Sequence, residues 1–340
     1  MELNIYSFAL ERCRVASKYI IKFRCAFPRS GWRGRGDSNS TIFSPQINPS
    51  NLLYKKFAMP YQLLILTKDW FLSDILPGKF RVLLGILNKG YSKPMARYGI
   101  IQSPRIKDHD QFLDSLQLDL GRVSVDLDKD FAVFLLLGSK GDFKRLEAEF
   151  AYKRHFNSEI WPLTNANDSD IPIDLAREFG FGPLSRDTVE HVTLAPTDRL
   201  GPDIADRVLA TIGVKTYTDD GHFREYDLSA GNKHYELTAF TSFMRGMGTE
   251  LLGYVSSAFL TTGKPTILRP AHVTRVVLHA VVIKEHDLVP YYSKVCGFVP
   301  STHPDVVVSV SGTDSPLESG IEASQDFTIS FLRRDLMVGK

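Results

Sequence analysis

The sequence predicts a mixed α/β (α+β) fold, because segments with strand-like and helix-like spacing alternate along it. The clearest unit is residues 233–263, which read as a strand, a glycine turn and an amphipathic helix. Its first part, Tyr235 to Phe243, is rich in the β-branched and aromatic residues that strands prefer. Residues 275–283 then form an almost continuous apolar run, which is typical of a strand buried on both faces.

The helix of this unit is predicted from its apolar spacing and its end signals. One helical face collects Met247, Leu251, Leu252, Val255, Ala258 and Phe259. Gly263, followed by Pro265, is a usual stop signal. The helix would begin in Arg245-Gly246-Met247-Gly248, so that free backbone N–H groups point out of a glycine loop. Such a helix start suits an anion, in particular a pyrophosphate, although the pattern also fits a plain structural turn.

Further strands and helices are expected on both sides of this unit. Strands are predicted at 61–67, 131–137, 306–310 and 326–332, and helices at 68–84 (broken near Pro77), 108–118, 147–156, 202–212 and after Asp287. A second strand–turn–helix pattern begins at Val192, but it has one glycine and is therefore a poorer phosphate cradle. No internal repeat is visible, and no apolar run reaches the roughly 18 residues of a membrane span.

Charge divides the chain into two parts. Residues 1–58 hold ten Lys or Arg against three Asp or Glu, whereas the whole chain has a net charge of only +2. This segment is expected to be a disordered basic extension, with a mitochondrial transit peptide or a true start at Met59 as alternatives. The domain proper is expected to span 59–340, with a long insertion at 151–232 and a ligand-binding core at 233–335.

The cysteine pattern limits the kinds of site that the chain can hold. Cys13, Cys25 and Cys296 include no C-x-x-C pair, which excludes a disulfide scaffold and a zinc finger and favours a reducing compartment. We expect no metal site. A net charge of +2 does not suggest a nucleic-acid-binding protein.

The order of elements over 233–335 resembles that of the GNAT superfamily of acyl-CoA-dependent N-acyltransferases. In that family the glycine loop reads [Q/R]-x-x-G-x-[G/A]; Gly246 and Gly248 match it, whereas Phe243 stands at the Gln/Arg position. The stretch from Tyr292 to Gly297 is similar to the family's Tyr-x-x-x-Gly-Phe, with one residue more. The resemblance implies a mostly antiparallel central sheet flanked by helices, and it makes 233–335 an acyl-CoA-binding core.

The function implied by this resemblance is transfer of an acetyl group from acetyl-CoA to a primary amine of a small molecule or peptide, by direct attack on the thioester. Glu236 is the candidate that accepts the amine proton, and Tyr292, or else Tyr291, would protonate the leaving thiolate. The resemblance places the coenzyme against Thr238, Ala239, Phe240, Met244, Arg245, Gly246, Met247, Gly248 and Thr249. Glu236 also fits an outward-facing strand residue, and either tyrosine fits core packing.

An alternative hypothesis is a catalytically impaired acyl-CoA-binding or interaction module. Phe243 in the glycine loop, the shifted tyrosine and the long insertion motivate it. Under either hypothesis we expect no nucleic-acid or membrane partner, a monomer or homodimer, and a cytoplasmic location, with mitochondrial import through 1–58 as the alternative. His279, inside an apolar strand, is expected to be a hydrogen-bonded structural residue rather than a catalyst.

Overall fold

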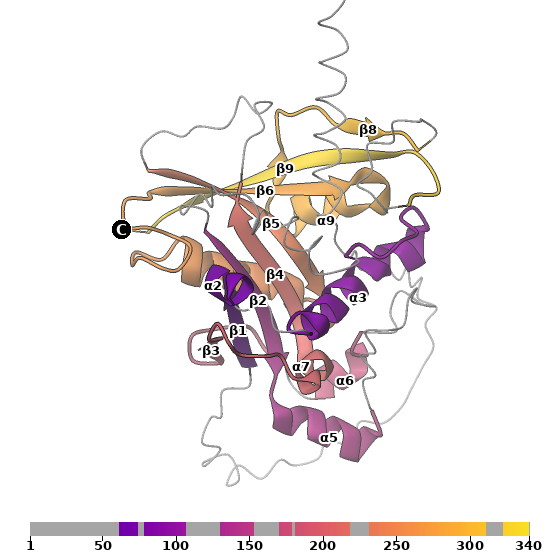
Figure 1. Cartoon of the computed structure of the whole chain (residues 1–340), viewed down its shortest axis with the longest axis vertical. Coiled ribbons are helices and arrows are strands. Elements are labelled where there is room, and N and C mark those ends of the chain that lie inside the picture. Colours follow the sequence, from indigo (N-terminus) through magenta and orange to yellow (C-terminus); the bar gives the residue numbers. More distant parts are fainter. Residues whose placement is uncertain are drawn as a thin grey trace, which may run out of the picture.

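The computed structural model describes residues 61–73, 78–106, 130–152, 170–178, 181–217, 231–310 and 322–339. Its centre is an open sheet with helices on both faces (Figure 1). The strands are β1 (Tyr61–Thr67), β2 (Phe131–Gly138), β3 (Val189–Thr193), β4 (Val208–Thr216), β5 (Asn232–Ser242), β6 (Arg275–Ile283), β7 (Val299–Pro300), β8 (Val306–Val308) and β9 (Phe327–Met337). The helical segments are α2 (Lys68–Leu72), α3 (Arg81–Tyr98), α5 (Lys140–Phe150), α6 (Ile173–Glu178), α7 (Pro202–Arg207), α8 (Met247–Val255), η3 (Ser256–Leu260), η4 (Lys284–His286) and α9 (Leu288–Lys294).

The described strands form one sheet in the order β3-β1-β2-β4-β5-β6-β9-β7, and β8 also pairs with β9. The pairings of β1 with β3 and of β5 with β6 are parallel. The other six pairings are antiparallel. The predicted fold class, a mostly antiparallel central sheet flanked by helices, is therefore confirmed.

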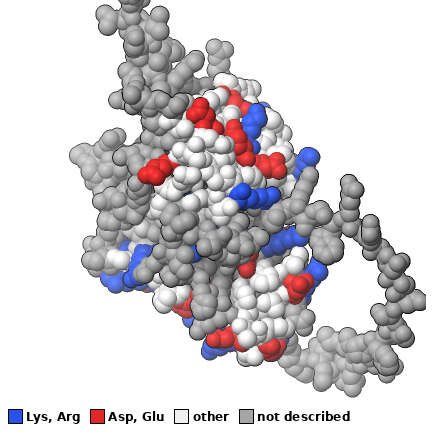
Figure 2. Space-filling model, turned by 90° about the vertical axis from the view of Figure 1, so that its right-hand side faces the viewer, with Lys and Arg blue, Asp and Glu red and all other residues white. Residues whose placement is uncertain are grey.

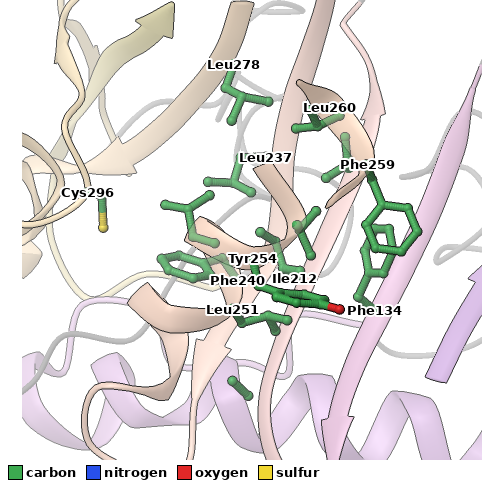
Figure 3. Close-up of a cluster of buried hydrophobic side chains, with 14 of the residues drawn as sticks. Phe134, Ile212, Leu237, Phe240, Leu251, Tyr254, Phe259, Leu260, Leu278 and Cys296 are labelled. Atoms are coloured by element: carbon green, nitrogen blue, oxygen red, sulfur yellow. The ribbon is translucent and has the colours of Figure 1, made fainter. Parts of the chain in front are cut away.

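Two hydrophobic cores lie on opposite faces of the sheet. Successive residues of β2 alternate between them. Val133 and Leu135 pack with α2 and α3 in what we call the α3-side core. Phe134 and Leu136 pack with α8 and α9 in what we call the α8-side core. All eight residues of β2 are buried, which explains its uninterrupted apolar sequence. Figure 3 shows part of the α8-side core, with Phe259 beside Phe134 at one end.

Most predicted elements are present, but the helix expected at 202–212 is wrong beyond its first half. Helix α7 ends at Arg207, and β4 begins at Val208. The run from Val208 is apolar and β-branched without helical spacing, and its residues are buried between β2 and β5. This central strand lies inside the range expected to be an insertion.

Three other predicted helices differ from the structure in extent or cannot be compared with it. The region 68–84 contains two helices, α2 and α3, and the second continues to Tyr98. The helix predicted at 147–156 is observed as α5, which runs from Lys140 to Phe150. It begins at Lys140 because Ser139 caps it, accepting a hydrogen bond from the Asp142 N–H at 3.0 Å. The helix predicted at 108–118 lies outside the described residues.

The parallel strands β5 and β6 form a fork. They pair from Asn232 and Arg275 up to Glu236 and His279, and among the described residues their pairing goes no further. Just beyond this point Ala239 has a positive φ of 47°, and the register of β5 on β4 shifts. A positive φ and a register shift of this kind mark a bend in a strand. Glu236 and His279 therefore lie where β5 and β6 begin to separate.

Two further properties concern the outside of the molecule. On the face drawn in Figure 2, basic and acidic side chains of the described residues are interspersed rather than gathered by sign. Among the helices that the structure describes, none combines the length and apolar character needed to cross a membrane.

Candidate functional site

One register row across four strands carries four ionisable side chains. Lys215 on β4 lies opposite Glu236 on β5, Glu236 opposite His279 on β6, and His279 opposite Arg333 on β9. Residues two positions away on the same strand lie on the same face of the sheet. Val281 and Phe331, which are two positions away from His279 and Arg333, belong to the α3-side core. The four side chains therefore project on the α3 side of the sheet. We call Lys215, Glu236, His279 and Arg333 the ionisable row.

The ionisable row runs from the interior towards solvent. Lys215 and Glu236 are 4% and 2% exposed, and Lys215 Nζ lies 3.6 Å from Glu236 Oε2. His279 is also buried, whereas the Arg333 side chain is 32% exposed. A buried charge is tolerated when an opposite charge lies beside it, and Lys215 and Glu236 meet this condition.

Two aromatic residues surround His279. His234 Nδ1 lies 2.9 Å from His279 Nε2, so the two rings form a hydrogen bond in which one nitrogen is the N–H donor and the other the acceptor. The ring of Tyr217 stacks on His279 with centroids 4.0 Å apart and planes at 15°. Imidazole is the side chain that exchanges protons most readily near neutral pH. The row therefore brings two imidazole rings and the Glu236 carboxylate close together.

The opposite face of β5 carries a separate polar group at the start of the strand. Tyr235 Oη donates to Asp130 Oδ2 at 3.1 Å, and Lys233 Nζ lies 2.9 Å from the same oxygen. Burial, and then the charge of Asp130, raise the pKa of Tyr235, so its phenol stays protonated. This group connects the start of β5 with the residue that precedes β2, on the face of the sheet opposite the ionisable row.

The structure separates the predicted catalytic residues. Glu236 lies in the ionisable row on the α3 side. Tyr292 is fully buried in the α8-side core, edge-to-face with Phe240 and Phe298 at 6.0 and 5.4 Å. Tyr291 is half-buried, and its hydroxyl lies 3.0 Å from Thr249 Oγ1 in the first turn of α8. Glu236 is thus brought together with Lys215 and lies apart from Tyr291 and Tyr292.

The glycine loop has the predicted geometry, and its first amides have partners inside the protein. Gly246 precedes α8 with φ 89°. The Met247 N–H donates to the Met244 carbonyl at 3.1 Å, and the Gly248 N–H donates to Ser242 Oγ at 3.2 Å. An anion at this loop would have to replace these two bonds. Arg245 and Gly246 are exposed, whereas Met244 and Met247 are buried.

The predicted cofactor contacts on β5 shape its bulge. Thr238 packs so closely on β4 that a Cβ at Gly213 would lie 2.7 Å from Thr238 Cγ2. The Ala239 carbonyl accepts a hydrogen bond from Thr211 Oγ1 at 2.5 Å. Phe240 points into the α8-side core. The contact of these residues and of the glycine loop with a cofactor stays a prediction.

Sequence reasoning identified Glu236 and noticed His279, but it missed Lys215 and Arg333. A usable signal was present, because Lys215, Glu236 and His279 are ionisable residues inside the largely buried strands β4, β5 and β6. Their alignment in one row could not be read without the strand register. Within the described ranges, no group of three or more His, Cys, Asp or Glu is arranged to hold a metal ion.

Comparison with known proteins places this chain beside a sporulation protein. Residues 56–336 match the family model described as "Sporulation protein RMD6". A curated protein with the same description, from Saccharomyces cerevisiae (strain ATCC 204508 / S288c), is 29% identical over 213 residues, which cover 63% of this chain and 69% of the yeast protein.

These matches overturn the functional interpretation drawn from the sequence. The resemblance to the GNAT superfamily is wrong as a family assignment, since the matching family is a different one. The predictions that depended on it are wrong as well: the N-acetyltransferase activity, the alternative acyl-CoA-binding module and the assignment as a transferase. The physical reason is that a strand, a glycine turn and a helix recur in many unrelated proteins. The acetyl-CoA cofactor, the amine partner and the cytoplasmic location are tested by no observation on this chain and stay predictions.

Proposed function

The chain belongs to the RMD6 sporulation protein family, and on that premise we propose that it acts in spore formation through the ionisable row. The observation that carries this proposal is the buried Lys215–Glu236 pair beside His279. Replacing a buried ion pair by apolar side chains is often neutral or stabilising, so stability alone gives little reason to keep one. Buried ionisable clusters are instead frequent at functional sites.

The proposed activity is the binding of a small polar ligand that approaches from the β9 side. Arg333 is the most exposed member of the row and supplies a cation for an acidic or hydrogen-bond-accepting group. Further in, the His234–His279 pair and Glu236 offer groups that can accept or donate a proton. The fork of β5 and β6 places these groups where parallel strands diverge, which is a common place for ligand sites.

A pair of variants separates a functional row from a structural one. Glu236→Gln removes one charge and leaves the Lys215 ammonium buried without its carboxylate, at an expected cost of about 3–5 kcal/mol in unfolding free energy. The double variant Lys215→Met with Glu236→Gln removes both charges at nearly constant volume. Its melting temperature should return close to that of the unmodified chain.

Spore formation is the functional readout. We expect this chain to restore spore formation in a Saccharomyces cerevisiae strain that lacks its similar sporulation protein, and the double variant to fail although it folds. Asp305→Asn is the matched control, because it removes an exposed carboxylate that pairs with Lys284 outside the ionisable row. The double variant forming spores as well as the unmodified chain would show that the ionisable row is structural. Failure of the unmodified chain would count against the sporulation role itself.

A further inference from the structure

A cavity of about 470 Å³ lies at the β3 end of the sheet, on the side of α8. Its walls include Val189 and His191 from β3, Tyr254 from α8, and Phe259 from η3. These residues are distinct from the ionisable row, which lies on the other face of the sheet. The volume falls within the range of about 300–1,000 Å³ that is usual for pockets that bind small molecules.

The floor of the cavity is apolar. Val189 and Phe259 are buried, and the centroids of the Phe259 and Phe134 rings are 4.9 Å apart. Figure 3 shows these two residues beside each other at one end of the α8-side core. Ile267, which also lines the cavity, is 45% exposed. An apolar ligand body in the cavity would cover this surface and gain the free energy of removing it from water.

The wall on the η3 side is fixed by local hydrogen bonds. Segment η3 is one turn of π-helix, closed by the Thr261 N–H donating to the Ser256 carbonyl at 2.9 Å. The Phe259 carbonyl accepts from Thr266 Oγ1 at 2.6 Å, which ties the following loop to this turn. The buried Arg269 guanidinium donates to the carbonyls of Thr262, Lys264, Pro270 and Val273. Single π-helical turns often occur at functional sites, and a wall held in this way is preformed.

Three of the side chains that line the cavity, those of His191, Tyr254 and Arg186, can carry a charge. His191 Nε2 lies 2.7 Å from Tyr254 Oη. Burial, and then Arg186, lower the pKa of His191, and burial raises the pKa of Tyr254, so both are neutral near pH 7. Arg186 is exposed and forms no ion pair with any residue in the described ranges. Among the lining residues it is the one with a permanent charge.

We propose that this cavity binds a small organic anion with an aromatic or otherwise apolar body. The acidic group would pair with the Arg186 guanidinium, whose planar donors match a carboxylate, sulfonate or phosphate. The body would lie on Phe259 and against Ile267. The His191–Tyr254 pair would orient the ligand by a hydrogen bond to the place where its acidic group joins its apolar body.

The test uses the fluorescent probe 8-anilinonaphthalene-1-sulfonate with the full folded chain. We expect saturable binding to one site, and at least a tenfold weaker affinity in Arg186→Gln. N-phenyl-1-naphthylamine, which has the same rings without the sulfonate, should bind the unmodified chain at least tenfold more weakly than the sulfonate does. Ile267→Ala should weaken both probes, since it removes apolar surface common to both.

The matched control is Arg199→Gln, which removes an exposed arginine that does not line the cavity. It should bind the sulfonate like the unmodified chain, and melting curves should show that both arginine variants are folded. Equal binding of the sulfonate by Arg186→Gln and the unmodified chain would overturn the proposal. So would equal affinity for the neutral probe, or the absence of saturable binding.

Discussion

At the scale of single residues, His286 couples folding to pH. It is 1% exposed in η4, and its ring stacks on Tyr98 with centroids 5.2 Å apart. Burial, and then the nearby Arg105, lower the pKa of His286 from 6.5 to about 3. The ring is therefore neutral in the folded protein at a pH where the unfolded chain binds a proton. Its contribution to stability is complete above pH 6.5 and is lost as the pH falls towards 3.

This shift predicts a pH-dependent loss of stability that one substitution removes. Between pH 6.5 and pH 5, the unmodified chain should lose about 2 kcal/mol of unfolding free energy through His286. His286→Gln cannot be protonated, so its unfolding free energy should fall by less over the same interval. Urea unfolding at pH 7.5, 6.5 and 5.0 measures the difference. His272→Gln, at an exposed position, controls for the loss of a histidine and should keep the pH dependence of the unmodified chain. Parallel pH profiles for the unmodified chain and His286→Gln would refute the assignment.

At the scale of elements, the approach of α3 to β5 depends on a glycine. A Cβ added at Gly90 would lie 2.8 Å from Thr241 Oγ1 and 2.9 Å from Thr241 Cγ2. Alanine is intrinsically the better helix former by roughly 0.5–1 kcal/mol. Here the clash should outweigh that gain, because forcing a methyl group into a packed interface costs about 1–3 kcal/mol. Gly90→Ala should therefore lower the melting temperature.

Gly253 in α8 provides the opposite case for the same substitution. It is exposed, and a Cβ at this position would meet no atom within 4 Å. Gly253→Ala should raise the melting temperature through helix propensity alone. If Gly90→Ala raised the melting temperature as Gly253→Ala is expected to do, the close packing of α3 on β5 would be wrong.

The elements also show what could be predicted from the sequence. Strands with clear apolar patterns, such as 61–67 and 275–283, were predicted with their observed limits. Strand β4 was missed because the proline-started helix α7 runs directly into it, and no glycine or proline separates the two elements at Val208. Without β4, Lys215 had no place beside Glu236. The ionisable row depends on pairing between strands far apart in the chain, and such register is fixed by tertiary packing rather than by local pattern.

At the scale of the whole molecule, the described architecture begins with β1, which pairs with β2 on one side and β3 on the other. The family match begins nearby, at residue 56. The domain start near Met59 stays a prediction, under which residues 1–58 add nothing to the stability of the fold. A chain that begins at Met59 should therefore keep the melting temperature of the full-length protein to within about 3 °C, which corresponds to roughly 1 kcal/mol for a protein of this size.

The shortened chain also distinguishes between the two interpretations of residues 1–58. Their excess of basic residues fits either a dispensable tail or a targeting segment. If the segment is a dispensable tail, the shortened chain keeps both its melting temperature and its ability to support spore formation. A kept melting temperature with lost spore formation would instead assign the segment a targeting role. A melting temperature lowered by clearly more than 3 °C would mean that residues before Met59 stabilise the fold, and the domain boundary would have to move towards the N-terminus.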